Sequence, residues 1–171
     1  VRGLRVSDGF LRVLGVNPSL GRNFTSDETQ LNGPLMAIIS DGLWHKYFGG
    51  DPATIGKQLL LNGRARTIVG ILPPRFRFEL PVDVLVPLQL VADPNDQGHN
   101  TGMLARIKSG ISIRQSQAEM DQLLPEFRQQ FPNQLGPTER GIRLERYQKH
   151  VVGDIGATLW FLFAAAGLVL V

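Results

Sequence analysis

The sequence of 171 residues contains no cysteine. Disulfides, thiolate nucleophiles and cysteine-ligated metal centres are therefore excluded, although the compartment is not, since exported proteins can also lack cysteine. The excess of positive charge is also small, since 18 Lys and Arg against 15 Asp and Glu leave a net charge of +3. The basic residues are too dispersed along the sequence for a nucleic-acid-binding surface. The three histidines, His45, His99 and His150, lack the short spacings of zinc sites. We expect no metal, no cofactor and no nucleic-acid partner.

The longest stretch without charge lies at the C-terminal end, from Ile155 to Val171. A helix of this length rises about 26 Å, slightly less than the ~30 Å of a bilayer core. Because the run is apolar on every face, it predicts the start of a transmembrane helix over residues 151–171 in preference to a buried core helix. We also expect the chain to be part of a longer protein. The expected membrane-embedded residues are Leu159, Trp160, Phe161, Leu162, Phe163, Leu168, Val169 and Leu170.

Basic residues precede this run, at Arg140, Arg143, Arg146 and Lys149. The positive-inside rule alone would place this flank in the cytoplasm. A folded domain of about 150 residues can, however, be translocated largely regardless of its charge. The orientation is therefore open at this point.

The remaining residues alternate between strand and helix patterns. Helices are expected after Ser7 and Ser40, each acting as an N-cap, with glycines at the C-terminal ends. Their predicted apolar faces are Phe10, Leu11 and Leu14 in the first helix, and Leu43, Trp44, Tyr47 and Phe48 in the second. Strands are expected at residues 1–6, 35–39, 58–61, 64–72, 83–87, 102–107 and 141–147. Mixed strands, a hairpin and short helices predict an α+β fold.

Two local signals are the most specific. Asn62-Gly63 separates two strand-like runs and predicts a type I′ turn, because this dipeptide accepts positive φ at both central positions. Ser112 with Gln115 predicts a capping box at the start of a long amphipathic helix that runs to Phe131. Pro125 inside that helix predicts a kink or a short break.

Three segments resemble chemical motifs only in part. Gly50 to Lys57 has Asp51 where a phosphate-binding loop requires glycine, and we interpret it as a proline turn that leads into a strand. Residues 93–98 start a calcium-loop pattern, but its twelfth position is Leu104 where a glutamate is needed. Residues 40–45 contain Ser, Asp and His, yet Ser40 is better used as a helix cap and nothing marks a nucleophile elbow.

Two pairs of arginines, Arg64 with Arg66 and Arg75 with Arg77, are two positions apart. In an extended segment each pair shares one face. A solvated face is the usual meaning of such a pair, and contact with an acidic partner surface is the alternative.

Several segments together resemble the extracytoplasmic core domain of MacB-type ABC transporter permeases, and their order and spacing match over essentially the whole chain. They are Val6 to Phe10, Leu14 to Val16, Gly21 to Phe24, Ser40 to Trp44, Phe48 to Asp51, Ile55 to Lys57, Leu61 to Gly63, Val69 to Ile71 with Pro73 and Phe76, Val86 to Leu88, and Val152 to Asp154. The nearest likeness is to the long permeases of soil bacteria with duplicated transmembrane and periplasmic units.

The resemblance implies a periplasmic core domain over residues 1–150, lacking its early part, on a permease of the bacterial inner membrane. It also implies an ABC ATPase partner, a permease dimer and no catalytic residues, so that the domain is not an enzyme. In this family, ATP hydrolysis on the cytoplasmic side drives movement on the periplasmic side. The alternative is a soluble ligand-binding or protein-binding module whose C-terminal helix is buried core.

Overall fold

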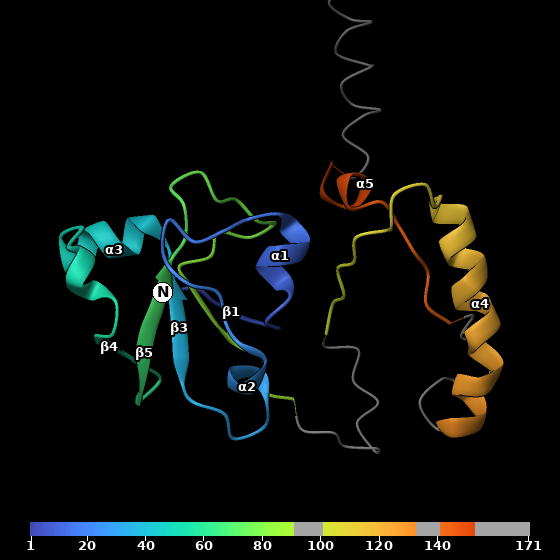
Figure 1. Cartoon of the computed structure of the whole chain (residues 1–171), viewed down its shortest axis with the longest axis horizontal. Helices are drawn as coiled ribbons and strands as arrows, with labels where there is room; N and C mark the ends of the chain where they lie inside the picture. Colours follow the sequence, from blue (N-terminus) through green and yellow to red (C-terminus); the bar gives the residue numbers. More distant parts are fainter. Residues whose placement is uncertain (91–100, 133–140, 153–171) are drawn as a thin grey trace, which may run out of the picture. The chain divides into compact units, whose positions relative to one another are not determined.

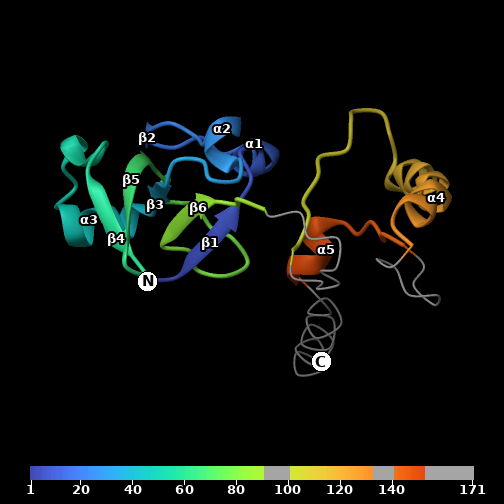
Figure 2. The same cartoon turned by 90° about the horizontal axis from the view of Figure 1, so that it is seen from below.

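The computed structural model describes residues 1–90, 101–132 and 141–152 (Figures 1 and 2). The chain divides into two compact units, Val1–Asp93 (unit 1) and Pro94–Val171 (unit 2). The expected domain boundary near residue 150 stays a prediction. The expected membrane-embedded residues 159–163 and 168–170, and the calcium-like residues 93–98, lie outside the described residues.

Unit 1 is a mixed sheet with short helices, which confirms the predicted α+β class. Its elements are β1 (Gly3–Val6), α1 (Phe10–Leu14), β2 (Leu20–Gly21), α2 (Ser26–Thr29), β3 (Met36–Ile39), α3 (Asp41–Phe48), η1 (Pro52–Thr54), β4 (Gln58–Leu61), β5 (Arg64–Ile71) and β6 (Val84–Pro87). The strand order is β1-β6-β3-β5-β2, and β4 pairs with β5. β1 runs parallel to β6 and β3 parallel to β5, whereas β3 and β6 are antiparallel.

The two faces of the sheet bury separate apolar clusters. One contains Val6, Leu11, Phe24, Ile38, Val69, Leu72 and Leu85, and the other Ala37, Ile39, Leu43, Ile68, Ile71 and Val84. Because its central strands are covered on both faces, Met36–Ile39 reads as a continuous apolar run without alternation. Fully burying a leucine or isoleucine side chain contributes about 1.5–3 kcal/mol. The sheet of unit 1 is therefore a stable platform for the loops at its ends.

The hairpin prediction is confirmed. β4 and β5 are antiparallel, with Leu61 opposite Arg64. Asn62 has φ 49° and Gly63 φ 73°, the pair of positive values that a type I′ turn requires.

Of the two serines predicted to cap helices, only Ser40 does so. Ser40 caps α3 as predicted, because its Oγ accepts a hydrogen bond from the Leu43 N–H at 3.2 Å. Ser7 does not cap α1: its carbonyl accepts from the Phe10 N–H at 3.2 Å, which forms a turn, so that α1 begins at Phe10. The prediction for Ser7 was wrong because a hydrogen-bonded turn precedes the helix.

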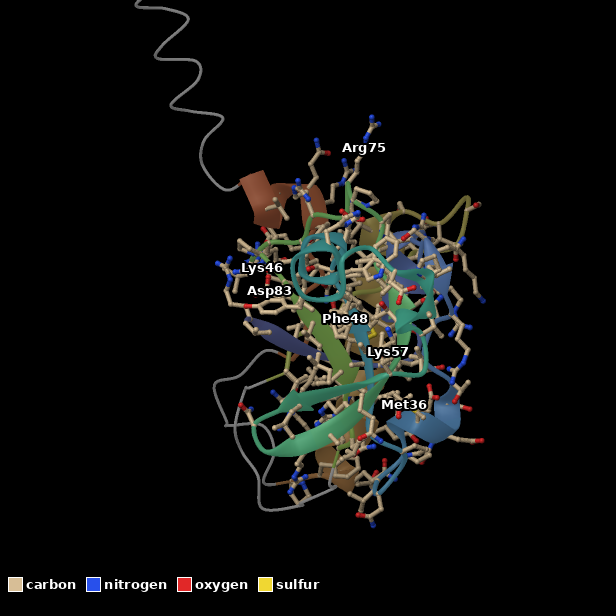
Figure 3. All side chains as sticks on the ribbon, turned by 90° about the vertical axis from the view of Figure 1, so that its left-hand side faces the viewer. Met36, Lys46, Phe48, Lys57, Arg75 and Asp83 are labelled. Carbon is tan, nitrogen blue, oxygen red and sulfur yellow. The ribbon has the colours of Figure 1, made fainter. Side chains whose placement is uncertain are left out.

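Tyr47 is also not part of the apolar face of α3, since it is 61% exposed. Leu43, Trp44 and Phe48 pack on the sheet, as the position of Phe48 in Figure 3 illustrates. The ring of Tyr47 instead lies beneath the ammonium group of its neighbour Lys46. The distance from Lys46 Nζ to the ring centroid is 5.2 Å.

In unit 2, the described residues form α4 (Ile113–Gln130) and α5 (Tyr147–Val152). The capping box is confirmed, because the Ser112 N–H donates to Gln115 Oε1 at 2.8 Å and the Gln115 N–H to Ser112 Oγ at 3.2 Å. α4 runs through Pro125 without a break. A proline removes only one backbone donor from the ladder, and the rest of the helix remains continuous.

The strands expected at residues 102–107 and 141–147 are not formed. A strand exists through hydrogen bonds to a neighbouring strand, and the described part of unit 2 offers none. The side-chain amide of Gln117 takes that role for part of the second segment: it donates to the Ile142 carbonyl at 3.0 Å and accepts from the Leu144 N–H at 2.7 Å. Tyr147 begins α5 in place of ending a strand. No helix within the described residues is both long and apolar enough for a membrane span.

Candidate partner-binding groove

The phosphate-loop-like segment is closed by its own side chains. The Asp51 carboxylate accepts from the Ala53 N–H at 2.8 Å and from Lys57 Nζ at 3.0 Å. The Lys57 hydrogen bond, followed by that of Ala53, lowers the pKa of the Asp51 carboxyl below its ordinary value. Thr54 is fully buried, and its hydroxyl donates to the Asp51 carbonyl. The interpretation of this segment as a proline turn before a strand is confirmed.

The N-terminal end of α3 is held by a hydrogen bond to a neighbouring loop and by its own cap. The Ser40 N–H donates to the Asp83 carbonyl at 2.7 Å, and the Ser40 hydroxyl caps the helix. Asp41 and His45 lie one turn apart, with Oδ2 3.5 Å from Nδ1. Nδ1 of His45 also lies 3.0 Å from the Asp41 carbonyl. Ser40 and His45 are thus both used locally, and the structure does not bring them together as nucleophile and base.

A groove of about 390 Å³ lies between this helix end and the loop that follows β5. Its polar groups are Ser40, Asp41, Arg77 and Glu79. Arg77 folds back on its own loop, where it donates to the Phe76 carbonyl at 2.8 Å. The apolar side chains of the lining are Leu72, Pro73, Pro74, Phe76, Phe78, Pro81 and Val82. Mostly apolar walls with a few carboxylates suit non-covalent contact with a partner.

The loop before β3 is organised around an ion pair with a buried carboxylate, which we did not predict from the sequence. Glu28 is 4% exposed, and its Oε1 lies 2.6 Å from Nη2 of Arg22. Its Oε2 accepts from Nη1 of Arg22 at 3.0 Å and from the Thr25 N–H at 2.9 Å. Burial alone would raise the pKa of the Glu28 carboxyl, but the hydrogen bonds from Arg22 and Thr25 outweigh it and hold the pKa below its ordinary value. The signal in the sequence was the capping-box spacing of Thr25 and Glu28.

The same loop also holds the segment after β6. The Gln89 side-chain amide donates to the Glu28 carbonyl at 3.1 Å and to the Gly33 carbonyl at 2.8 Å. Gln89 is close to the end of unit 1 at Asp93. The last described residues of unit 1 are therefore attached to the loop that contains the ion pair.

Known proteins with a similar sequence or fold are transporter domains. Residues 1–123 match the family described as MacB-like periplasmic core domain. Among solved structures, the chain is similar to the periplasmic region of MacB from Actinobacillus actinomycetemcomitans, with 14% identity and a TM-score of 0.50 over 78% of this chain and 66% of that one. It is also similar to the extracellular domain of the noncanonic ABC-type transporter YknZ from Gram-positive bacteria, with 21% identity and a TM-score of 0.38 over 50% of this chain and 42% of that one. No curated protein matches the sequence.

The chain thus spans less than two thirds of either solved chain. At this identity, the likeness to the MacB structure supports the fold alone. The family match is stronger evidence, because it covers all of unit 1 and reaches into α4. It confirms the resemblance found in the sequence, and the chain belongs to the family of MacB-like periplasmic core domains.

Proposed function

We propose that this chain is the extracytoplasmic domain of an ABC transporter permease in the bacterial inner membrane. The domain couples ATP hydrolysis by a partner ATPase to movement on the periplasmic side, in export or mechanotransmission, and the permease acts as a dimer. The observation that carries this proposal is the family match over residues 1–123. The domain itself performs no catalysis in this proposal.

The packing of unit 1 supports transmission of movement. Ile38, Ile39 and Ile68, on the two adjacent central strands, are fully buried. Close-packed interiors have low compressibility, so a displacement applied at one end of the sheet is passed to the other. The Gln89 hydrogen bonds attach the segment after β6 to the Arg22–Glu28 loop. A force on that segment therefore acts on the body of unit 1 as well as on β6.

The groove beside α3 supports partner contact without chemistry. Its carboxylates, from Asp41 and Glu79, stand among proline and phenylalanine side chains. Such a surface offers charge and apolar area to a periplasmic partner or to a transported molecule.

The proposal is tested by measuring the distance between the two units in the intact permease with its ATPase. Because this chain has no cysteine, Leu31→Cys and Leu123→Cys introduce labelling sites, and both native residues are more than half exposed. We expect the label-to-label distance distribution to shift between the nucleotide-free state and an ATP-bound state trapped by a hydrolysis-deficient ATPase.

A matched control places both labels in unit 1, with Leu31→Cys and Leu60→Cys. This distance should be the same in the two nucleotide states, because unit 1 moves as a body. An inter-unit distance that is insensitive to ATP would contradict the proposed coupling.

A further inference from the structure

Unit 2 contains a cavity of about 600 Å³ that is lined entirely by described residues. One wall is the segment that leads into α4, from Ala105 to Arg114, and the other is the start of α5, from Glu145 to Tyr147. These two parts of unit 2 lie side by side in Figures 1 and 2. A cavity of this volume is large enough for a small-molecule ligand.

Both walls are held by hydrogen bonds within unit 2. The Gln117 side chain of α4 donates to the Ile142 carbonyl at 3.0 Å and accepts from the Leu144 N–H at 2.7 Å, directly before Glu145. On the other wall, the Ile111 N–H donates to the Lys108 carbonyl at 3.1 Å and so forms a turn in front of α4. The cavity is therefore shaped by contacts of unit 2 itself.

The charge inside this cavity is positive. Its charged side chains are Arg114, Glu145 and Arg146. Oε1 of Glu145 lies 3.2 Å from Nζ of Lys149, so a cation outside the lining compensates this carboxylate. Over residues 101–132 and 141–152, neither the Arg114 nor the Arg146 guanidinium forms an ion pair or a hydrogen bond, and both side chains are exposed. Two uncompensated guanidiniums suit a phosphate group.

The same cavity also has an apolar part, made of Ile107, Ile111 and Ile113. Ile107 is 38% and Ile111 40% exposed, so hydrocarbon can reach them from outside. A hydrated free anion gains nothing from isoleucine side chains, because they offer no hydrogen bond. A ligand that uses the whole cavity therefore combines an anionic group with hydrocarbon, as a phospholipid does at the boundary between headgroup and acyl chains.

The position of the cavity along the chain favours a lipid over an acidic peptide. α5 is about 9 Å long, and the three chain steps from Val152 to Ile155 span at most about 11 Å. The start of α5 therefore lies within about 20 Å of the apolar run that predicts a transmembrane helix. If that run enters a bilayer, headgroup phosphates stand beside the cavity at high effective concentration, whereas a peptide must be recruited from solution.

We infer that the cavity between the segment before α4 and the start of α5 binds an anionic phospholipid. Arg114 and Arg146 hold the phosphate, and the three isoleucines contact the first carbons of the acyl chains. This inference rests on the proposed function, because a bilayer lies next to the cavity only in a permease. The bound lipid fixes the start of α5 at the membrane surface, where α5 leads into the apolar run.

The test measures how much lipid the immobilised full chain retains from micelles of a zwitterionic detergent. We expect saturable retention of phosphatidylglycerol and little retention of phosphatidylcholine with the same acyl chains. Both lipids contact the apolar run of residues 155–171 alike, so their difference reports the anionic site. High salt should weaken the retention of phosphatidylglycerol, because screening reduces the attraction between arginine and phosphate.

Two double variants separate the cavity from the general charge of unit 2. Each basic residue beside anionic lipid contributes about fivefold in affinity, so Arg114→Gln with Arg146→Gln should weaken retention on the order of 25-fold. The charge-matched control, Lys108→Gln with Arg143→Gln, removes two exposed cations of unit 2 that do not line the cavity. This control should retain phosphatidylglycerol nearly as the parent does.

Further variants test the two halves of the cavity. Arg114→Lys with Arg146→Lys keeps both charges and should keep most of the affinity, which provides a comparison even if the glutamine variant melts below the parent. Ile111→Ser should weaken retention of phosphatidylglycerol without restoring any difference in favour of phosphatidylcholine.

Equal retention of the two lipids overturns the inference, and so do equal losses in the cavity variant and its charge-matched control. Displacement of the lipid by an equal concentration of glycerol 3-phosphate would assign the cavity to a free phosphate. Displacement by an equal concentration of hexaglutamate peptide would assign it to an acidic protein. Either result excludes the lipid. The assay needs neither ATPase nor nucleotide, so its failure is distinct from a failure of the proposed coupling.

Discussion

Nη2 of Arg22 lies 2.6 Å from Oε1 of Glu28, in a pair whose carboxylate is almost completely buried while the guanidinium is half-exposed. The two residues are six positions apart along the chain. Glu28 is also linked to the segment after β6, because its backbone carbonyl accepts from the Gln89 side-chain amide. A local ion pair thus contributes to how the last described segment of unit 1 is held.

We expect Glu28→Gln to destabilise unit 1 by about 1–3 kcal/mol, because a charged hydrogen bond is lost and the Arg22 guanidinium remains. Thermal or urea unfolding measures the difference. Asp8→Asn is the matched control: its partner Arg12 is 3.8 Å away and largely exposed, so the cost should be about 0–1 kcal/mol. Equal costs for the two variants would contradict the importance of burial.

The Glu28 carboxyl should make the free energy of unfolding depend on pH. Its pKa in the folded chain lies below the ordinary value of 4.5, so the unfolded chain binds its proton first as the pH falls. Its contribution is complete above that ordinary value and is lost as the pH falls through the lower, folded pKa. We expect Glu28→Gln to lose this component of acid destabilisation, which unfolding curves between neutral and acid pH would show.

Gly63→Ala should destabilise unit 1 by about 1 kcal/mol, since Gly63 has φ +73° and an added Cβ meets no atom within 4 Å. The cost is therefore that of the backbone conformation alone. Gly42→Ala in α3 is the matched control, because a Cβ there also meets nothing and φ is not positive. It should be neutral or stabilising by up to about 1 kcal/mol. A Gly63→Ala chain that melts no lower than the parent rules out the type I′ turn.

Phe163→Arg should shift the chain from the membrane or detergent fraction toward the soluble fraction. Phe163 lies outside the described residues, in the apolar run that predicts a transmembrane helix. An arginine at the centre of such a helix opposes insertion by about 2.5–3.5 kcal/mol. Sedimentation with and without detergent measures the shift. If the unmodified chain is monomeric and soluble without detergent, the span prediction is wrong.

We expect no saturable binding of ATP to this chain, with or without magnesium. Asp51 occupies the position of a cradle glycine and holds the Lys57 ammonium at 3.0 Å, so the segment presents a carboxylate where a phosphate would need backbone donors. Titration with labelled ATP measures this. Micromolar binding that Lys57→Ala abolishes would contradict both the interpretation of residues 50–57 and the dependence on a partner ATPase.

Much of the local structure could be predicted from the sequence. Asn62-Gly63 specifies its turn through backbone conformations that few other residues accept. Ser40 and Ser112 specify helix starts through hydrogen bonds that span only three residues. The order and spacing of the segments that resemble the family were sufficient to indicate it, and the match over residues 1–123 then showed it.

Other features depend on which segments meet in space, and only the tertiary structure decided them. Residues 102–107 and 141–147 have strand patterns but no strand partner in the described residues. A strand pattern cannot specify its partner, because pairing requires hydrogen bonds from elsewhere in the chain. Arg5 and Arg66 are 61 positions apart, yet the sheet order places them close enough to repel each other. The sequence by itself determined the turns, the helix caps and the family, because these depend on neighbouring residues. The tertiary structure decided the register of the sheet, the proximity of Arg5 to Arg66 and the burial of Glu28, because these depend on contacts between distant segments.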